Sequence, residues 1–214
     1  MGLYNVNQRT AIEFVKNRIL GTLTYFSLSD NLGLSLPERV NQHIVTAPFV
    51  IDDDGKTLYT HIRKTAPYWD KMEGKVIASF YGPDDYISAR AYQDPDAIST
   101  WHFMRVDARG RREIIDDKAG ILGILARTSD LAESKDNARN PWNIGVPSPG
   151  KVDRLSDQIF GLRISLDEGG LTGYFKFDQG ETHSGKLSLI EYLTLRGAEY
   201  PKTTILRMIQ DNLK

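Results

Sequence analysis

The sequence contains no cysteine, which excludes disulfides, thiolate nucleophiles, cysteine-ligated zinc and iron–sulfur clusters. It also lacks a surplus of positive charge, because 27 Lys and Arg residues face 28 Asp and Glu residues and the formal net charge is −1. Proteins that bind nucleic acid nonspecifically gain affinity by neutralising phosphates and usually carry a basic surplus. The charge balance and the lack of a convincing helix-turn-helix pattern therefore argue against direct DNA binding.

Several other signatures are missing. No apolar run approaches the roughly 20 residues of a membrane span, and the first residues lack the pattern of a signal peptide. The four histidines show no close metal-ligand spacing. A glycine-rich dinucleotide fingerprint, a P-loop and a G-x-S-x-G elbow are all absent. The sequence predicts a cytoplasmic protein with no membrane segment and no metal site.

The composition itself is ordinary for a globular protein. The 214 residues are 40% hydrophobic and 26% charged, and they contain no internal repeat and no long linker. A chain of this size buries enough surface to fold without disulfides or metals. We therefore expect one domain over residues 1–214.

Strand patterns dominate the chain. Short segments rich in aromatic and β-branched residues alternate with turn signals. The expected strands are 19–26, 43–51, 57–63, 75–81, 98–106, 111–115, 160–166 and 171–177, with turns at 52–55, 82–83, 107–110 and 168–170. The expected helices are 10–16, 64–72, one around 121–125, 186–196 and one from 201, and 132–150 is expected to be a loop. This order predicts a mainly β, α+β fold, an antiparallel barrel with peripheral helices.

The strand 57–63 has two distinct faces. Leu58, Thr60 and Ile62 suit a barrel interior, whereas His61 and Arg63 point to the other side. Arg63-Lys64-Thr65 then ends the strand, and two cations, a hydroxyl and backbone N–H groups suit a phosphate. The alternative for the cations is a solvated surface, and a lone histidine such as His61 is more often packed than functional.

Two further segments combine polar groups with aromatic rings. Residues 86–92 and 100–103 include Ser88, Thr100, Trp101 and His102, which suit a planar heterocycle with a polar edge, although such strand aromatics are usually core. Residues 176–180 end a late strand with Lys176 and Gln179, which suit a ligand carbonyl, phosphate or ring edge, or else a solvated strand end.

In their order along the chain these segments resemble one family. Residues 59–69 resemble a G-H-x-x-x-x-N-P-x-W stretch, residues 86–92 and 100–103 resemble Y-[IV]-S-P-x-W-Y followed by T-W-N-Y, and residues 174–179 resemble K-W-K-L-S-Q-N. These are motifs of PaiB-type proteins, the FMN-binding negative transcriptional regulators of the split-barrel group that includes pyridoxamine-phosphate oxidase. Residues 59–64 also resemble that oxidase group's phosphate-contacting strand. Ala66, Ala89 and His102 stand where PaiB-type proteins have Asn, Pro and Asn.

The resemblance implies an antiparallel FMN-binding split β-barrel that forms a homodimer, with FMN near the subunit interface. It implies that Arg63 and Lys64 hold the phosphate with help from nearby side chains, and that other residues line the ring or ribityl chain. The implied cofactor-binding residues are Thr60, His61, Arg63, Lys64, Thr65, Ser88, Thr100, Trp101, His102, Lys176 and Gln179, the last two from the same subunit or from its partner.

The function that follows is FMN binding, in a flavin-dependent oxidoreductase or a flavin-linked regulator of transcription. The alternatives are a regulatory protein without turnover and a heme-binding protein with a histidine as axial ligand. Among the implied site residues, His61 and His102 are the credible proton carriers. No acid–base pair stands out, so no catalytic residue is assigned.

Overall fold

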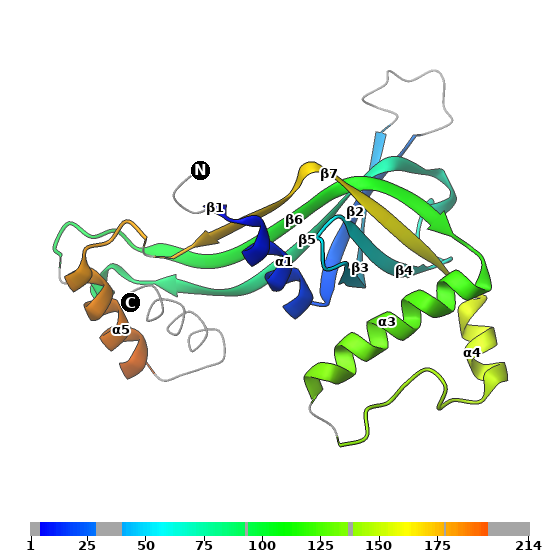
Figure 1. Cartoon of the computed structure of the whole chain (residues 1–214). Coiled ribbons are helices and arrows are strands. Elements are labelled where there is room, and N and C mark those ends of the chain that lie inside the picture. Colours follow the sequence, from blue (N-terminus) through cyan, green and yellow to red (C-terminus); the bar gives the residue numbers. More distant parts are fainter. Residues whose placement is uncertain (1–4, 29–39, 93, 137–138, 178, 197–214) are drawn as a thin grey trace. The chain divides into compact units, whose positions relative to one another are not determined.

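The structure is a computed structural model that describes residues 5–28, 40–92, 94–136, 139–177 and 179–196. Within these residues seven strands form one antiparallel sheet (Figure 1). Their order is β1 (Asn5–Val6), β7 (Ile159–Lys176), β4 (Thr57–Arg63), β3 (Val40–Ile51), β2 (Leu20–Leu28), β5 (Met72–Ile87) and β6 (Thr100–Ile115). Because β6 also pairs with β7, the sheet closes on itself.

Helices accompany this sheet. The described residues contain α1 (Gln8–Asn17), α3 (Lys118–Asp136), α4 (Pro149–Ser156) and α5 (His183–Leu195), with short 3-10 turns η1 (Trp69–Lys71) and η2 (Ala89–Ala91). A closed antiparallel sheet with peripheral helices confirms the predicted mainly β, α+β class and is consistent with a split barrel.

The chain divides into two compact units. The barrel unit comprises Gln8–Phe80 and Asp107–Thr172, and the terminal unit comprises Met1–Asn7, Tyr81–Val106 and Gly173–Lys214. The strands β5, β6 and β7 contribute residues to both units. A single domain over residues 1–214 stays a prediction.

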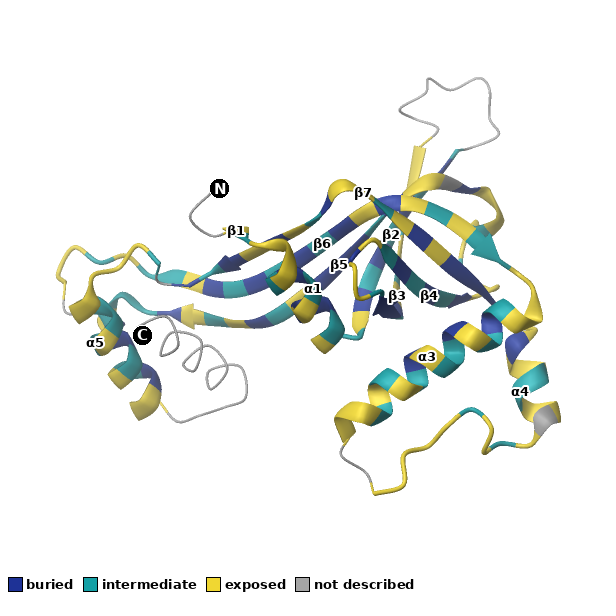
Figure 2. Cartoon of the chain, in the orientation of Figure 1, coloured by how far each residue is buried: buried dark blue, intermediate teal, exposed yellow. Residues whose placement is uncertain are grey.

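The core of the barrel unit follows the alternation of the strands. In β4, Leu58, Thr60 and Ile62 are buried, while the residues between them are half-buried, as predicted (Figure 2). Phe49 from β3 and Phe80 from β5 are fully buried and meet edge to face, with ring centroids 5.2 Å apart. Burying such large apolar side chains is the main stabilisation of a barrel of this kind.

Two predicted turns are wrong, because β6 and β7 are each one continuous strand. A side chain at Gly110 would collide with the carbonyl oxygen of Ser165, and one at Gly170 would collide with that of Arg109. These glycines therefore permit the close approach of β6 and β7 and do not mark the ends of hairpins.

Other element boundaries also differ from the prediction. The strand β5 runs on through the Gly82-Pro83 position, and the segment 64–72 contains a turn and η1 where a helix was predicted. The helix α3 extends through Asp136 and so occupies the start of the segment 132–150, which was predicted to be a loop, and α4 begins at the last two residues of that segment. The expected helix from residue 201 and most of the loop after β2 lie outside the described residues.

A candidate flavin cavity in the barrel unit

A cavity of about 790 Å³ lies in the barrel unit. Its walls come from β3, β4, α3, α4 and the segment before α4. The helix α3 packs against β3, β4 and α4, so both helices and strands contribute to the lining. Figure 1 shows these elements. The lining is largely apolar and includes Val45, Ile62, Leu125, Trp142, Ile144, Val152, Leu155 and Ile159. A mainly apolar concavity of this size is typical of small-molecule and cofactor sites.

The charged groups of this cavity are all positive. Arg63, at the end of β4, and Lys151, in the first turn of α4, line it, and no Asp or Glu among the described residues does. Within the described part of the chain, neither cation forms an ion pair. Both charges are therefore available to an anion, and the remaining polar lining is formed by Thr46, His61, Thr65, Ser129 and Gln158.

His61 also lines this cavity and carries a buried nitrogen, Nδ1, without a hydrogen-bond partner among the described residues. Burial lowers the pKa of this imidazole below its usual 6.5, so the ring is neutral near pH 7. A buried polar atom without a partner costs free energy, so a ligand whose polar edge reached this nitrogen would gain stability.

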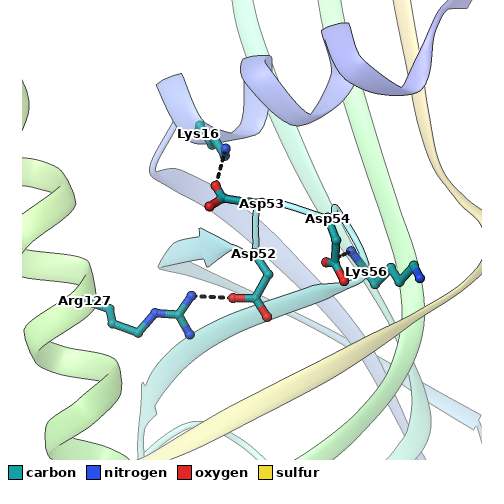
Figure 3. A network of polar contacts seen from close by, with 6 residues as sticks. All are labelled: Lys16, Asp52, Asp53, Asp54, Lys56 and Arg127. Carbon is teal, nitrogen blue, oxygen red and sulfur yellow. Dashed lines mark hydrogen bonds and ion pairs between the residues drawn. The ribbon is translucent and has the colours of Figure 1, made fainter.

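The β3–β4 turn forms ion pairs with two helices of the barrel unit (Figure 3). Asp52 accepts a hydrogen bond from the Arg127 guanidinium on α3 at 2.5 Å, and Asp53 pairs with Lys16 on α1 at 2.6 Å. Arg127 also lies 4.4 Å from the ring centroid of Tyr59 on β4. The two contacts of Arg127 hold α3, whose Leu125 and Ser129 line the cavity, against the barrel.

Only some of the predicted cofactor-binding residues on β4 and in the turn after it line the cavity. His61, Arg63 and Thr65 line the cavity. Thr60 is fully buried on the opposite face, and its hydroxyl donates to the carbonyl oxygen of Pro48 at 2.6 Å. Lys64 is exposed and is not part of the lining, while its backbone N–H donates to the carbonyl oxygen of Gln158 at 2.9 Å.

The other predicted residues belong to the terminal unit. Thr100 and Lys176 line a smaller cavity of about 220 Å³, and the Lys176 ammonium donates to the Thr100 hydroxyl at 2.8 Å. Ser88 caps η2 by accepting from the backbone N–H of Arg90. Trp101 is exposed and meets Tyr86 edge to face, with ring centroids 5.7 Å apart.

His102 lies in the interior of the terminal unit, and the side chain of Gln179 bonds to the backbone at the end of β7 and just after it. His102 is fully buried, and neither ring nitrogen has a hydrogen-bond partner among the described residues. Burial, and then the nearby Lys176 charge, lower the pKa of His102 to about 4. The Gln179 amide donates to the carbonyl oxygen of Phe175 at 2.7 Å and accepts from the N–H of Phe177 at 2.8 Å.

Lys151 and Gln158 were missed by the sequence reasoning. Lys151 lies in the first turn of α4 and Gln158 follows its end, directly after a segment whose prolines and polar residues favour a loop. The available signal was Ser148 followed by Pro149, because serine is a preferred N-cap and proline suits the first helical position.

The family follows from residues 3–168, which match the family model described as "Putative FMN-binding domain". The chain belongs to this FMN-binding family. The match bears out FMN or a related flavin as the cofactor and includes all the residues of β4 and its following turn. It ends before Lys176 and Gln179. No curated protein matches the chain.

Solved structures of low sequence identity share the fold of this FMN-binding family member. A conserved hypothetical protein from Mycobacterium tuberculosis aligns with TM-score 0.56 and 13% identity, over 86% of this chain and 93% of that chain. The FAD and heme binding protein from Mycobacterium smegmatis aligns with TM-score 0.52 and 12% identity, over 79% of this chain and 71% of that chain. At such identities the likeness shows the fold alone. Within the described residues, no helix is long and apolar enough to span a membrane.

Proposed function

We propose that the protein binds FMN in the barrel-unit cavity, with the phosphate held by Arg63 and Lys151. The observation that carries this proposal is the charge pattern of the cavity: two cations without ion-pair partners among the described residues, and no carboxylate in the lining. FMN has the matching chemistry, a phosphate with a charge of about −2 joined to a large planar ring.

Size and lining support the same ligand. The volume of about 790 Å³ lies within the range of roughly 300–1,000 Å³ that is usual for cofactor pockets. Arg63 would bind two phosphate oxygens with its guanidinium, and Thr65 would add a hydroxyl. Lys64, exposed beside Arg63, would add positive potential without lining the cavity.

The rest of the lining suits the ring. Apolar side chains from β3, α3 and α4 exclude water, and Trp142 offers an aromatic surface. The unpartnered Nδ1 of His61 would hydrogen-bond a polar edge of the ligand. When bound, FMN would supply electron or hydride transfer, while these residues supply position and electrostatics.

Oxidoreductase activity is part of this proposal, and a flavin-linked regulator of the PaiB type is its alternative. An oxidoreductase reduces its flavin with a pyridine nucleotide and is reoxidised over many cycles, whereas a sensor binds flavin and turns over poorly. The homodimer and the cytoplasmic location stay predictions. Measuring pyridine nucleotide consumption by the flavin-loaded protein separates the two roles.

One observation also favours a second ligand, heme. His61 is a neutral imidazole with an unpartnered nitrogen in a largely apolar cavity, which is also what an axial iron ligand requires. A Soret band in the purified or heme-titrated protein, lost in His61→Ala, would support heme. Binding of FMN with no Soret band would support the flavin.

The decisive experiment compares FMN with riboflavin, which has the same ring but no phosphate. Titrations followed by flavin fluorescence should show tighter binding of FMN, because riboflavin leaves Arg63 and Lys151 without an anion. Equal affinities of the two flavins would remove the phosphate from the proposal. No binding of either flavin would contradict the proposed function.

A further inference from the structure

We propose that the terminal unit contains a separate binding site for a small zwitterion, a molecule with one carboxylate and one ammonium group such as an amino acid. The site is the cavity of about 220 Å³ lined by Lys176, Thr100, Asp94 and Glu181. Lys176 would bind the ligand's carboxylate, and the two acidic residues would bind its ammonium.

The positive side of this cavity is Lys176. It is half-buried at the end of β7, and its ammonium donates one hydrogen bond, to the Thr100 hydroxyl at 2.8 Å. It forms no ion pair within the described part of the chain. An ammonium has three donors, so two remain for a ligand carboxylate.

The negative side is formed by Asp94 and Glu181. One Asp94 oxygen accepts from the backbone N–H of Asp96 at 2.9 Å, which leaves its other oxygen for a ligand. Glu181 forms no ion pair or side-chain hydrogen bond with any described residue. Lys176 thus shares a cavity with two carboxylates and pairs with neither. A ligand with both charges would satisfy all three groups.

Short-range contacts connect the described residues around these charges. Gln179 holds the loop after β7 through its two hydrogen bonds to the backbone of Phe175 and Phe177. Thr182, next to Glu181, caps α5 by accepting from the N–H of Gly185 at 3.1 Å. On the other side, the N–H of Ala97 donates to the carbonyl oxygen of Asp94 at 3.1 Å. A preorganised site loses less entropy on binding.

The cavity does not suit FMN. Its volume of about 220 Å³ is below the roughly 300 Å³ at which cofactor pockets begin, and its two carboxylates would repel a phosphate. This assigns Lys176 and Thr100 to a small ligand, in contrast to the flavin role that the family resemblance implies for them. The inference does not depend on FMN binding in the barrel unit.

Calorimetric titration of the full chain with glycine, β-alanine and 4-aminobutyrate tests the site, because these zwitterions differ in the spacing of their charges. Acetate, propionate and butyrate carry only the negative charge of each probe, and the corresponding alkylamines carry only the positive charge. We expect at least one zwitterion to bind about tenfold or more tightly than both of its half-ligands. No zwitterion binding, or a half-ligand that binds as tightly, would overturn the proposal.

Two substitutions should have opposite effects on the half-ligands. Lys176→Met should weaken the zwitterion about tenfold or more and abolish carboxylate binding, but leave the alkylamine unchanged. Glu181→Gln should weaken the zwitterion and the alkylamine, but leave the carboxylate unchanged. Glu191→Gln, an exposed acid on α5 outside the lining, is the matched control. If Lys176→Met fails to fold by circular dichroism, Lys176→Gln, which retains a donor for Thr100, replaces it.

The same variants distinguish this site from the flavin site. Lys176→Met should bind FMN with the affinity of the unmodified protein, and Arg63→Ala combined with Lys151→Ala should bind the zwitterion normally. A parallel loss of FMN affinity in Lys176→Met would show that Lys176 belongs to the flavin site and would overturn the assignment. Failure of FMN to bind at all would refute only the proposed function.

Discussion

The two cavities of this chain differ in the sign and arrangement of their charges. Among the residues that the structure describes, the barrel-unit cavity is lined by two cations, by no carboxylate and by mostly apolar side chains. The terminal-unit cavity is smaller, and one cation faces two carboxylates in a lining that is mostly polar. Both contain charged groups without ion-pair partners among the described residues, but only the first matches a large anion. The charge of the lining, rather than the presence of cations alone, thus distinguishes a phosphate site from a site for a dipolar molecule.

The strongest test of this contrast removes the cations of the larger cavity. Arg63→Ala combined with Lys151→Ala should weaken FMN binding by about 2–4 kcal/mol, or roughly 30- to 1,000-fold, because two charge-assisted contacts are lost. Riboflavin affinity should change little, so fluorescence titration should show the preference for FMN disappear. Lys75→Ala, an exposed lysine of the barrel unit outside the lining, is the matched control. A folded double variant with unchanged FMN affinity would exclude this phosphate site.

The two buried histidines provide a second comparison. His102 has a pKa of about 4, against 6.5 for an ordinary histidine. Between pH 6.5 and pH 4, His102 is therefore protonated in the unfolded chain but neutral in the folded chain. The free energy of unfolding falls as the pH drops through this range. The full loss is about 3 kcal/mol. Burial lowers the pKa of His61 as well, but His61 lines a cavity that a ligand would fill.

Denaturant unfolding between pH 7 and pH 4 checks this effect. His102→Phe should keep the edge-to-face contact with Phe177, whose ring centroid lies 5.9 Å away, and should remove most of the pH dependence. A variant that loses stability with acid as steeply as the unmodified protein would show that His102 is not the group responsible. Bound FMN should reduce the contribution of His61 to the pH dependence of stability and leave the contribution of His102 unchanged.

Sequence reasoning succeeded where a local pattern and the tertiary environment agree. The bounds of β4 and its two faces follow from strict alternation, and this placed His61 and Arg63 on one side of the strand. The prediction also assigned Thr60 to the phosphate, although the same alternation places Thr60 on the buried face of β4. Neighbours in the sequence are thus weaker evidence for a shared site than neighbours on one face.

Other features depend on contacts between distant segments, which a single sequence does not show. Gly110 and Gly170 suggest turns, yet each allows one strand to approach another that is far away in the chain. Lys151 lines the cavity only because α4 packs near α3. The burial of His102 follows from the packing of the sheet, whereas its sequence neighbours suggest a ligand-facing role.

A smaller effect should come from Arg127, which lines neither cavity but holds α3, which contributes to the lining of the larger one. Arg127→Ala removes the ion pair with Asp52 and the contact with the Tyr59 ring, and should destabilise the protein by about 1 kcal/mol. FMN affinity should fall severalfold because Leu125 and Ser129 lose their support, while zwitterion affinity should not change. Arg127→Lys should restore the charge but not the flat stacking surface, and so only part of the affinity. An unchanged FMN affinity in Arg127→Ala would show that α3 needs no such anchor.

The smallest effect is expected at Asp53, which follows Asp52, the ion-pair partner of Arg127, in the β3–β4 turn. Its carboxylate pairs with Lys16 at 2.6 Å but is 98% exposed, and the hydrogen bond from Lys16 lowers its pKa while water screens the pair. Asp53→Asn should therefore leave both stability and FMN affinity within experimental error, whereas Asp52→Asn, next to it in the same turn, should reproduce part of the Arg127→Ala effect. Thermal unfolding and FMN titration of the two variants compare the Asp52–Arg127 pair, which holds α3, with the solvated pair of Asp53 with Lys16 on α1. Equal effects of the two substitutions would mean that the turn acts through its backbone and that neither ion pair positions the cavity.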